Sequence, residues 1–164
     1  MKSTSLHGAL ATLYSELANG AVNDGGAFVL NSGDAGLLRS LDKLSADDAS
    51  QTSHAGATIA AHAEHVRYGL SLMNAWARQG GNPFATADWS RAWETAVVTD
   101  AEWGGIRRGL REESDAWLAQ IETPREMSDI ELTGMIGSIA HLAYHLGAMR
   151  QISRGARGPR ELGR

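Results

Sequence analysis

The sequence predicts an all-α protein, a four-helix bundle with a short extra helix and a partly ordered loop that contains tryptophans. Four long segments repeat apolar side chains at helical spacing. Capping residues, glycines and prolines mark the ends of those segments. No run is typical of a strand, since residues 27–30 are apolar but too few and too isolated to found a sheet. Four long helices joined by loops favour a bundle.

The first part of the chain contains one long helix and one short one. Residues 5–19 carry leucines on one stripe and form the first predicted helix. Residues 23–36 are rich in glycine, asparagine and aspartate and predict a loop. Asp34 can cap the short extra helix, which extends to Leu44. The polar residues 45–52 predict a turn.

A second long helix is predicted over residues 53–79, and Gly80 and Gly81 end it. The following segment, residues 82–98, contains Trp89 and Trp93 and is expected to be partly ordered. Tryptophans four residues apart most often pack in a core, and this interpretation is favoured. The alternative is that they form a lid wall over the mouth of a pocket.

Two capping boxes begin the last two long helices. In this motif a Ser or Thr cap is followed three residues later by Glu, and the caps here are Thr99 and Ser128. Helices are therefore predicted over residues 100–121 and 129–153. Residues 154–164 contain arginine, glycine and proline and are expected to be a flexible tail.

Length and composition indicate one domain, expected over residues 1–153, in a chain of 164 residues. The net charge of −4 disfavours a nucleic-acid partner. The absence of cysteine excludes disulfides, thiolate nucleophiles and cysteine zinc sites. The N-terminal residues lack the apolar core of a secretion signal. The longest apolar stretch, residues 135–149, is too short for a bilayer, so a cytoplasmic protein without a membrane partner is expected.

His141 and His145 lie four residues apart on the last predicted helix. Their positions differ by about 40° around the helix and by roughly 6 Å along it, so their ring nitrogens can converge on one cation. Apolar residues cover nearly the whole circumference of that helix, which is typical of burial. The neighbours on the histidine line are small, namely Gly134, Ser138 and Ala148, and leave room for a ligand.

His62 and His65 lie on the second long helix, about 60° apart around it, so both can face inward but not equally. A third imidazole from a facing helix would complete a set with an open coordination position, as catalytic metal sites need. Neutral imidazoles favour Zn, Ni, Fe or Cu over Mg or Ca. The alternative is that the histidines are hydrogen-bonded packing residues, and spacing alone leaves both open.

The stretch TIAAHAEHVRYGL, the later ADW and the closing AHLAYHLGAMRQI resemble the DinB-like (YfiT-like) metalloprotein superfamily, over about residues 37–152. The resemblance implies a four-helix bundle with an up-down-down-up path and a long crossover. By position it implies His65, His141 and His145 as ligands of a divalent transition metal (Zn, Ni or Fe). His62 departs from the pattern and is expected to be a proton shuttle or a hydrogen-bond partner of a bound ligand. Exchanged roles of His62 and His65 stay open.

A cation held by three neutral histidines can acidify bound water or thiol, or polarise a carbonyl. Superfamily relatives include low-molecular-weight thiol S-transferases and isomerases, so the resemblance implies a transferase-like enzyme with a small-molecule substrate. Any thiol would have to arrive as cosubstrate, because the chain has no cysteine. The alternatives are a metal-dependent hydrolase and a non-catalytic stress-response or binding protein whose metal staples the helices.

Two further expectations concern proton carriers and assembly. Glu64 and Tyr144 are candidate proton carriers beside His62. Their angular offset from the ligand line instead favours a solvated helix face for Glu64 and packing for Tyr144. Bundles of this type often pair, so a homodimer is expected.

Overall fold

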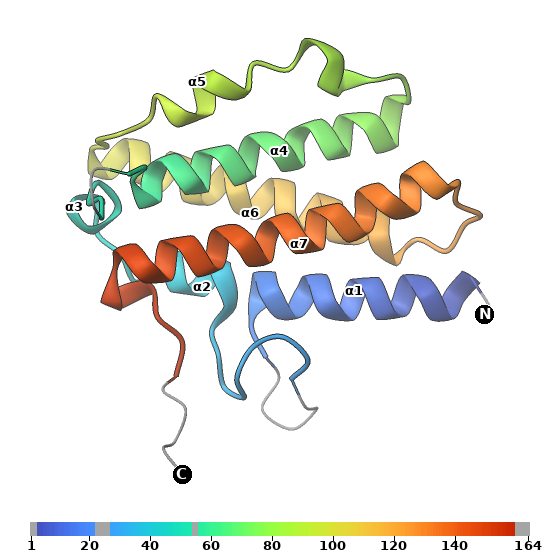
Figure 1. Cartoon of the computed structure of the whole chain (residues 1–164), viewed down its shortest axis with the longest axis horizontal. Coiled ribbons are helices and arrows are strands. Elements are labelled where there is room, and N and C mark those ends of the chain that lie inside the picture. Colours follow the sequence, from blue (N-terminus) through green and yellow to red (C-terminus); the bar gives the residue numbers. More distant parts are fainter. Residues whose placement is uncertain (1–2, 22–26, 54–55, 160–164) are drawn as a thin grey trace.

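Four long helices pack side by side in the structure, a computed structural model that describes residues 3–21, 27–53 and 56–159 (Figure 1). Across these ranges the chain forms helices and turns and no strand, which confirms the all-α class. The long helices are α1 (Ser3–Asn19), α4 (Ile59–Gln79), α6 (Asp100–Glu122) and α7 (Asp129–Ile152). The short helices are α2 (Gly36–Leu41), α3 (Ala46–Ala49) and α5 (Trp89–Trp93), with single 3-10 turns η1 (Pro83–Thr86) and η2 (Arg154–Ala156).

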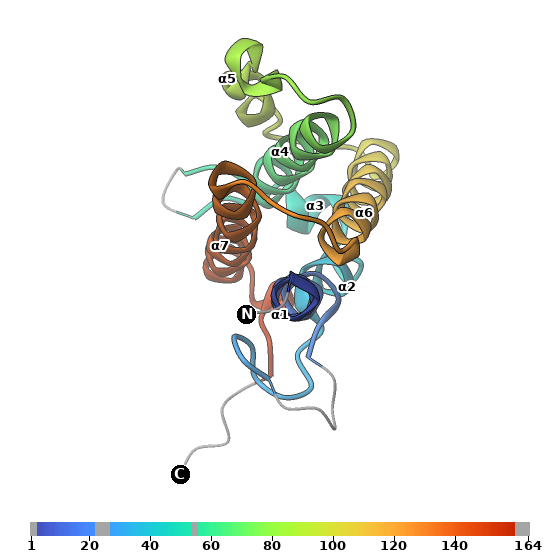
Figure 2. The same cartoon turned by 90° about the vertical axis from the view of Figure 1, so that its right-hand side faces the viewer.

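Each long helix packs mainly against two others. Helix α1 contacts α6 and α7, and α4 contacts the same two helices. Figure 2 views the four helices nearly end on and shows them around a shared interior. In Figure 1, α1 and α7 run in one direction and α4 and α6 in the other. The long connection between the parallel helices α4 and α6 returns along the outside of α4 and carries α5.

The observed path is therefore up, down, down, up, as the superfamily resemblance implies. Any bundle with a long connection between parallel neighbours takes such a path, so the path alone assigns no family. The path also determines which parts of the helices lie side by side. Because α4 and α7 are antiparallel neighbours, the first half of α4 lies beside the second half of α7. Those two halves carry the four histidines predicted to matter.

The long helices begin and end close to their predicted bounds, with one exception. The capping boxes at Thr99 and Ser128 are both formed, and α6 and α7 start directly after them. Helix α4 is the exception, since it begins at Ile59 and not at residue 53. Thr58 caps it by accepting a hydrogen bond from an amide in the first turn. Residues 54 and 55, at the predicted start, lie outside the described part.

The region between α1 and α4 differs from the prediction in two places. The short helix α2 ends at Leu41 rather than at Leu44, and its N-cap residue is Ala35. Asp34 still helps to begin it, because its carboxylate accepts from the amide of Gly36 at 2.9 Å. The predicted turn contains a second short helix, α3, because Ser45 opens a capping box. Of the predicted loop, residues 22–26 lie outside the described part.

Helix α7 is buried on one face only, which corrects the prediction of general burial. Five of its apolar side chains belong to the core, namely Met135, Ile139, Leu142, Leu146 and Met149. Ile136 and Tyr144 are exposed, at 52% and 69%. No helix in the described ranges has the length and apolar character needed to cross a membrane.

The predicted tail starts with an ordered turn. Residues 154–156 form η2, and Ala156 is buried against the bundle. The backbone oxygen of Ala156 accepts a hydrogen bond from the Arg150 guanidinium at 3.2 Å. The packed part of the chain therefore extends past residue 153, and residues 160–164 lie outside the described part.

Candidate metal centre

Three of the predicted histidines meet between α4 and α7. His65 comes from the first half of α4, and His141 and His145 from the second half of α7. The Nε2 atom of His141 lies 3.1 Å from that of His65 and 2.9 Å from that of His145. One ligand nitrogen from each ring falls within 4.8 Å of the other two. The cluster is largely buried and could hold a metal ion.

The spacing of these nitrogens suits a shared cation. In a tetrahedral site with metal–nitrogen bonds of about 2.0–2.1 Å, ligand nitrogens lie about 3.3 Å apart. A neutral imidazole carries one hydrogen, and a hydrogen bond needs one donor and one acceptor. Three Nε2 atoms turned toward one another therefore cannot all be satisfied by mutual hydrogen bonds, whereas a cation accepts all three lone pairs.

The surroundings keep the histidines in the form that binds metals. Burial, together with the neighbouring charges that His141 and His62 would carry, lowers the pKa of His65 to about 4. Burial lowers the pKa of His145 to about 3, with smaller contributions from the other three rings. Burial also lowers the pKa of His62 and of His141. All four rings are therefore neutral near pH 7, and neutral imidazole is the ligand form.

His62 lies behind the cluster. Its Nδ1 atom is 2.9 Å from the Nδ1 atom of His145, the ring nitrogen that does not face the other Nε2 atoms. The structure thus brings His65 into the three-nitrogen group and places His62 against a member of that group. By contrast, the Nδ1 atom of His65 is buried with no hydrogen-bond partner within the described part. The proton-shuttle role of His62 stays a prediction.

Trp89 and Trp93 cover the histidines from outside. The Trp93 ring stacks on His65, with centroids 4.3 Å apart and planes 27° apart, and the Trp89 ring lies 5.6 Å from His65. Each tryptophan is 38% exposed, so the favoured interpretation as core residues is wrong. Their contacts fit the alternative, a wall over the site. Asp88 begins their helix, α5, by accepting a hydrogen bond from the amide of Arg91.

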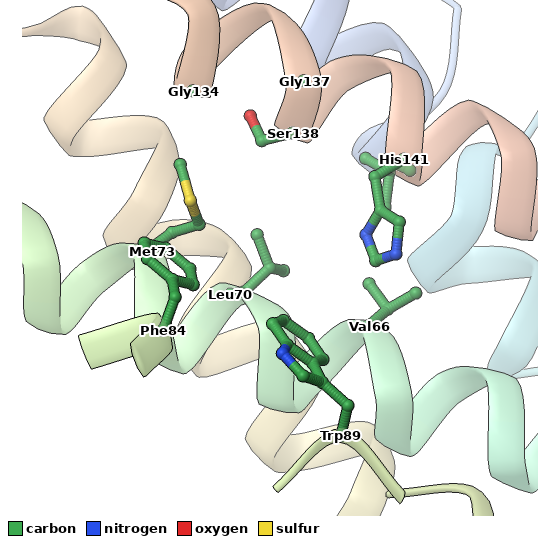
Figure 3. Close-up of a pocket in the computed structure, with 11 residues that line it drawn as sticks. Val66, Leu70, Met73, Phe84, Trp89, Gly134, Gly137, Ser138 and His141 are labelled. Atoms are coloured by element: carbon green, nitrogen blue, oxygen red, sulfur yellow. The ribbon is translucent and has the colours of Figure 1, made fainter. Parts of the chain in front are cut away.

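A pocket of about 320 Å³ adjoins the cluster between α4 and α7 (Figure 3). His141 forms one end of the lining, and Met73 and Phe84 lie toward the other. Trp89 closes one side. The lining is mostly apolar or glycine, with Ser138 and His141 as its polar members. The complete set is Val66, Gly69, Leu70, Met73, Phe84, Trp89, Gly134, Gly137, Ser138, His141 and Leu142.

The two other candidate proton carriers occupy different settings. The carboxylate of Glu64 accepts two hydrogen bonds from the guanidinium of Arg67, at 2.5 and 2.7 Å. Tyr144 is exposed, and its ring stands edge-on beside His145 with centroids 5.0 Å apart. Neither residue lines the pocket next to His141.

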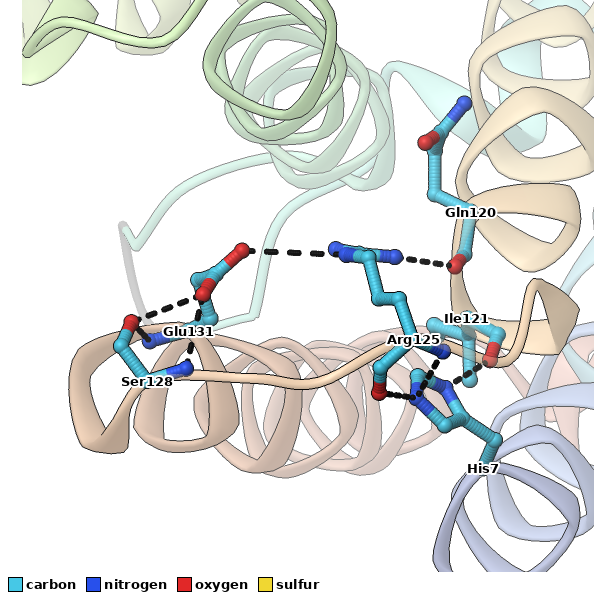
Figure 4. A network of polar contacts seen from close by, with 6 residues as sticks. All are labelled: His7, Gln120, Ile121, Arg125, Ser128 and Glu131. Carbon is cyan, nitrogen blue, oxygen red and sulfur yellow. Dashed lines mark hydrogen bonds and ion pairs between the residues drawn. The ribbon is translucent and has the colours of Figure 1, made fainter. Parts of the chain in front are cut away.

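His7 has a structural role away from the site (Figure 4). Its Nδ1 atom donates to the backbone oxygen of Ile121 at 2.7 Å, and its Nε2 atom accepts from the amide of Arg125 at 3.3 Å. The Arg125 guanidinium donates to the backbone oxygen of Gln120 and lies 3.7 Å from the carboxylate of Glu131. This network ties α1 to the turn between α6 and α7.

Sequence reasoning did not find most of the pocket wall. Phe84 lies in the turn that follows α4, and nothing in its spacing distinguishes it from a loop residue. Gly69 and Gly137 are glycines inside helices, where they lower helix stability relative to alanine. The indication in the sequence is the line of small residues beside the histidines, of which Gly134 and Ser138 line the pocket.

Comparison of the chain with family models, with curated proteins and with solved structures finds no match to any of them. The fold and the site therefore assign the chain to a class of protein but to no particular family. The chain is a helical protein with a buried three-histidine cluster that could hold a metal ion.

Proposed function

We propose that this chain is a metal-dependent enzyme of the DinB-like superfamily, with thiol S-transfer as its reaction. His65, His141 and His145 hold a divalent transition metal. The observation that carries the proposal is the convergence of three Nε2 atoms beside a pocket of about 320 Å³. The motif resemblance supports the same three ligands.

The open coordination position supports catalysis over a structural staple. Structural zinc sites are closed by four protein ligands, whereas catalytic sites keep three and leave a position for substrate. In the described part of the chain, the cluster contains three side chains with suitable atoms. The nearest further histidine, His62, faces the Nδ1 atom of His145 and so lies on the wrong side of that ring.

The ligand set and its neighbours favour a thiol. When bound, a divalent cation supplies positive charge that lowers the pKa of a thiol or water molecule beside it. Three neutral histidines leave that charge uncompensated. A free thiol has a pKa of about 8.5, so it needs far less help than water to ionise. Within the described ranges no carboxylate lines the pocket to act as a base for hydrolysis, and Glu64 is engaged by Arg67.

The chain's own residues supply binding and shielding. The three histidines would hold the cation beside the pocket, because His141 belongs both to the cluster and to the pocket lining. Trp93, stacked on His65, and Trp89, beside it, restrict water at the site. The sulfur comes from a small thiol in solution, because the chain itself has no cysteine.

Metal analysis followed by an activity assay tests the proposal. The purified protein is expected to contain a stoichiometric transition metal, and His141→Ala to lose it. Ile136→Ala is the matched control, since Ile136 is exposed on the same helix and does not line the pocket. Protein that stays metal-free in the presence of Zn, Ni and Fe ions contradicts the proposal.

The assay uses a low-molecular-weight thiol and 1-chloro-2,4-dinitrobenzene. A sulfur–carbon bond forms, the carbon–chlorine bond breaks, chloride leaves with the electron pair, and the thiol proton passes to the buffer. We expect the metal-loaded protein to form the thioether product and the metal-free protein not to form it. Metal-dependent hydrolysis of an activated ester without any thiol, and no thiol transfer, would assign the site to a hydrolase instead. A metal-loaded protein inactive in both assays would indicate a structural staple.

A further inference from the structure

We propose that the pocket between α4 and α7 selects an uncharged, apolar substrate group, up to about the size of two fused aromatic rings. The reacting end of the substrate points toward His141. Only this orientation rests on the proposed function. The class of group that the pocket accepts follows from the pocket alone.

The chemistry of the lining excludes charged groups. The walls are formed by Val66, Leu70, Met73, Phe84, Trp89 and Leu142. Among the residues that the structure describes, no Asp, Glu, Lys or Arg lines the pocket. A charged or strongly polar group would lose its water there without gaining a partner, which is unfavourable. An apolar group gains free energy in proportion to the area it buries.

The second polar residue of the lining offers little to a ligand. The Ser138 hydroxyl donates to the backbone oxygen of Met135 at 2.7 Å and accepts from the indole nitrogen of Trp117 at 2.9 Å. Its hydrogen is therefore already used inside the protein. This leaves His141 as the polar end of the pocket, and His141 is directed to the cluster through its Nε2 atom.

The size of the pocket sets an upper limit on the group. A cavity of about 150 Å³ holds benzene, and this pocket has about 320 Å³. A group of two fused aromatic rings would therefore fit in the pocket. Glycine keeps the space open on both helices. A Cβ atom at Gly69 would contact His141 and Trp89 at 3.7 and 3.8 Å, whereas one at Gly137 would meet nothing within 4 Å.

The arrangement of the walls fixes the direction of a bound group. Figure 3 shows His141 at one end of the open space and Met73 and Phe84 at the other, with Trp89 along the side. A flat ring lying against Trp89 therefore has one end beside the histidine cluster. In the proposed thiol transfer this is the electrophile, whose reacting carbon faces the cluster.

Titration with 2-naphthol, followed by calorimetry, tests the inference on protein with and without metal. The protein is expected to bind 2-naphthol in both states and not to bind glucose, a polar molecule of comparable size. Gly137→Leu fills the pocket and is expected to weaken binding by about tenfold or more. Gly147→Leu is the matched control, since Gly147 lies on the same helix outside the pocket and a Cβ there also meets nothing.

Gly69→Ala provides a second variant, because its Cβ atom enters the space between His141 and Trp89 without a severe clash. It is also expected to weaken 2-naphthol binding. Unchanged binding in both pocket variants, or binding of glucose as tight as that of 2-naphthol, overturns the inference. A protein that binds metal but no naphthol refutes this inference alone. A protein that binds naphthol but no metal refutes the proposed function and, with it, the orientation of the substrate toward His141. The class of group that the pocket accepts would still stand.

Discussion

His62 and His145 face each other through their Nδ1 atoms, which lie 2.9 Å apart. The other ring nitrogen of His145, Nε2, faces His141. If His145 presents the lone pair of Nε2 to a cation, its Nδ1 atom must carry the hydrogen, and His62 accepts it. Partners of this kind fix the tautomer and the orientation of a metal ligand. With a cation in the cluster, His62 would therefore act as a positioning residue for His145.

Replacing His62 is expected to weaken metal binding without abolishing it. His62→Ala should lower the affinity by about 10–100-fold, the usual effect of losing such a partner. His65→Ala should abolish stoichiometric binding, because it removes one of the three convergent nitrogens. Competition titration against a chelator measures both.

His62→Asn is the matched control, because its amide oxygen can take the place of the Nδ1 acceptor and restore part of the affinity. Wild-type affinity in His62→Ala contradicts the positioning role. Complete loss of metal in His62→Ala, with metal retained in His65→Ala, would show that the two histidines have exchanged roles.

Removing Trp93 is expected to cost little stability, because it forms a wall and not a core. Trp93→Ala should lower the free energy of unfolding by about 1–2 kcal/mol, because a side chain that is 38% exposed buries only part of its apolar area. Trp103→Ala should cost about 3–5 kcal/mol, as for other buried aromatic residues. Trp103 is 1% exposed, and its indole donates to the backbone oxygen of Leu44 at 2.8 Å. Urea denaturation compares the two variants. Equal losses of unfolding free energy would contradict the interpretation that Trp93 lies in a wall over the site and not in the core.

Local motifs made the long helices predictable. The capping boxes at Thr99 and Ser128 each involve residues three apart, so their formation depends little on the rest of the chain. The start of α4 was missed because a Thr cap without a box partner is a weaker motif. Helix α3 was missed because Asp48, and not Glu, completes its box at Ser45.

The site was predictable only where residues share a helix. The spacing of His141 and His145 requires their rings to lie on one face. Whether His62 or His65 joins them depends on the rotation of α4 about its axis, which packing sets and spacing does not. The same limit applies to Trp89 and Trp93, since tryptophans four residues apart have the same spacing in a core and in a wall.

Acid is expected to weaken a contact outside the site. The Glu16 carboxylate accepts hydrogen bonds from the amides of Phe28, Val29 and Leu30. Desolvation raises its pKa, but these donors together lower it further, and the net pKa is below the ordinary value. Its stabilisation is therefore complete above the ordinary pKa and is lost as the pH falls through the lower folded value.

Glu16→Gln is expected to destabilise the protein by about 1–3 kcal/mol near neutral pH, because a charged acceptor is lost. The difference from wild type should shrink as the pH falls below about 4.5, where the unfolded carboxylate becomes protonated. Urea denaturation over a pH series measures this. Glu112→Gln, at an exposed position on α6, is the control. A difference that stays constant with pH contradicts the assignment.

A metal held only by the folded chain must stabilise it. At a free concentration of about 100 times the dissociation constant, binding adds about 2.7 kcal/mol to the free energy of unfolding. For a chain of this length about 1 kcal/mol corresponds to a shift of about 2–4 °C, so zinc is expected to raise Tm by about 5–10 °C. Magnesium should give no shift, because it prefers oxygen ligands. Differential scanning calorimetry measures both. The zinc shift should vanish in His141→Ala and persist in Ile136→Ala, which changes an exposed side chain of the same helix. A zinc shift that survives in His141→Ala would place the ion elsewhere in the chain.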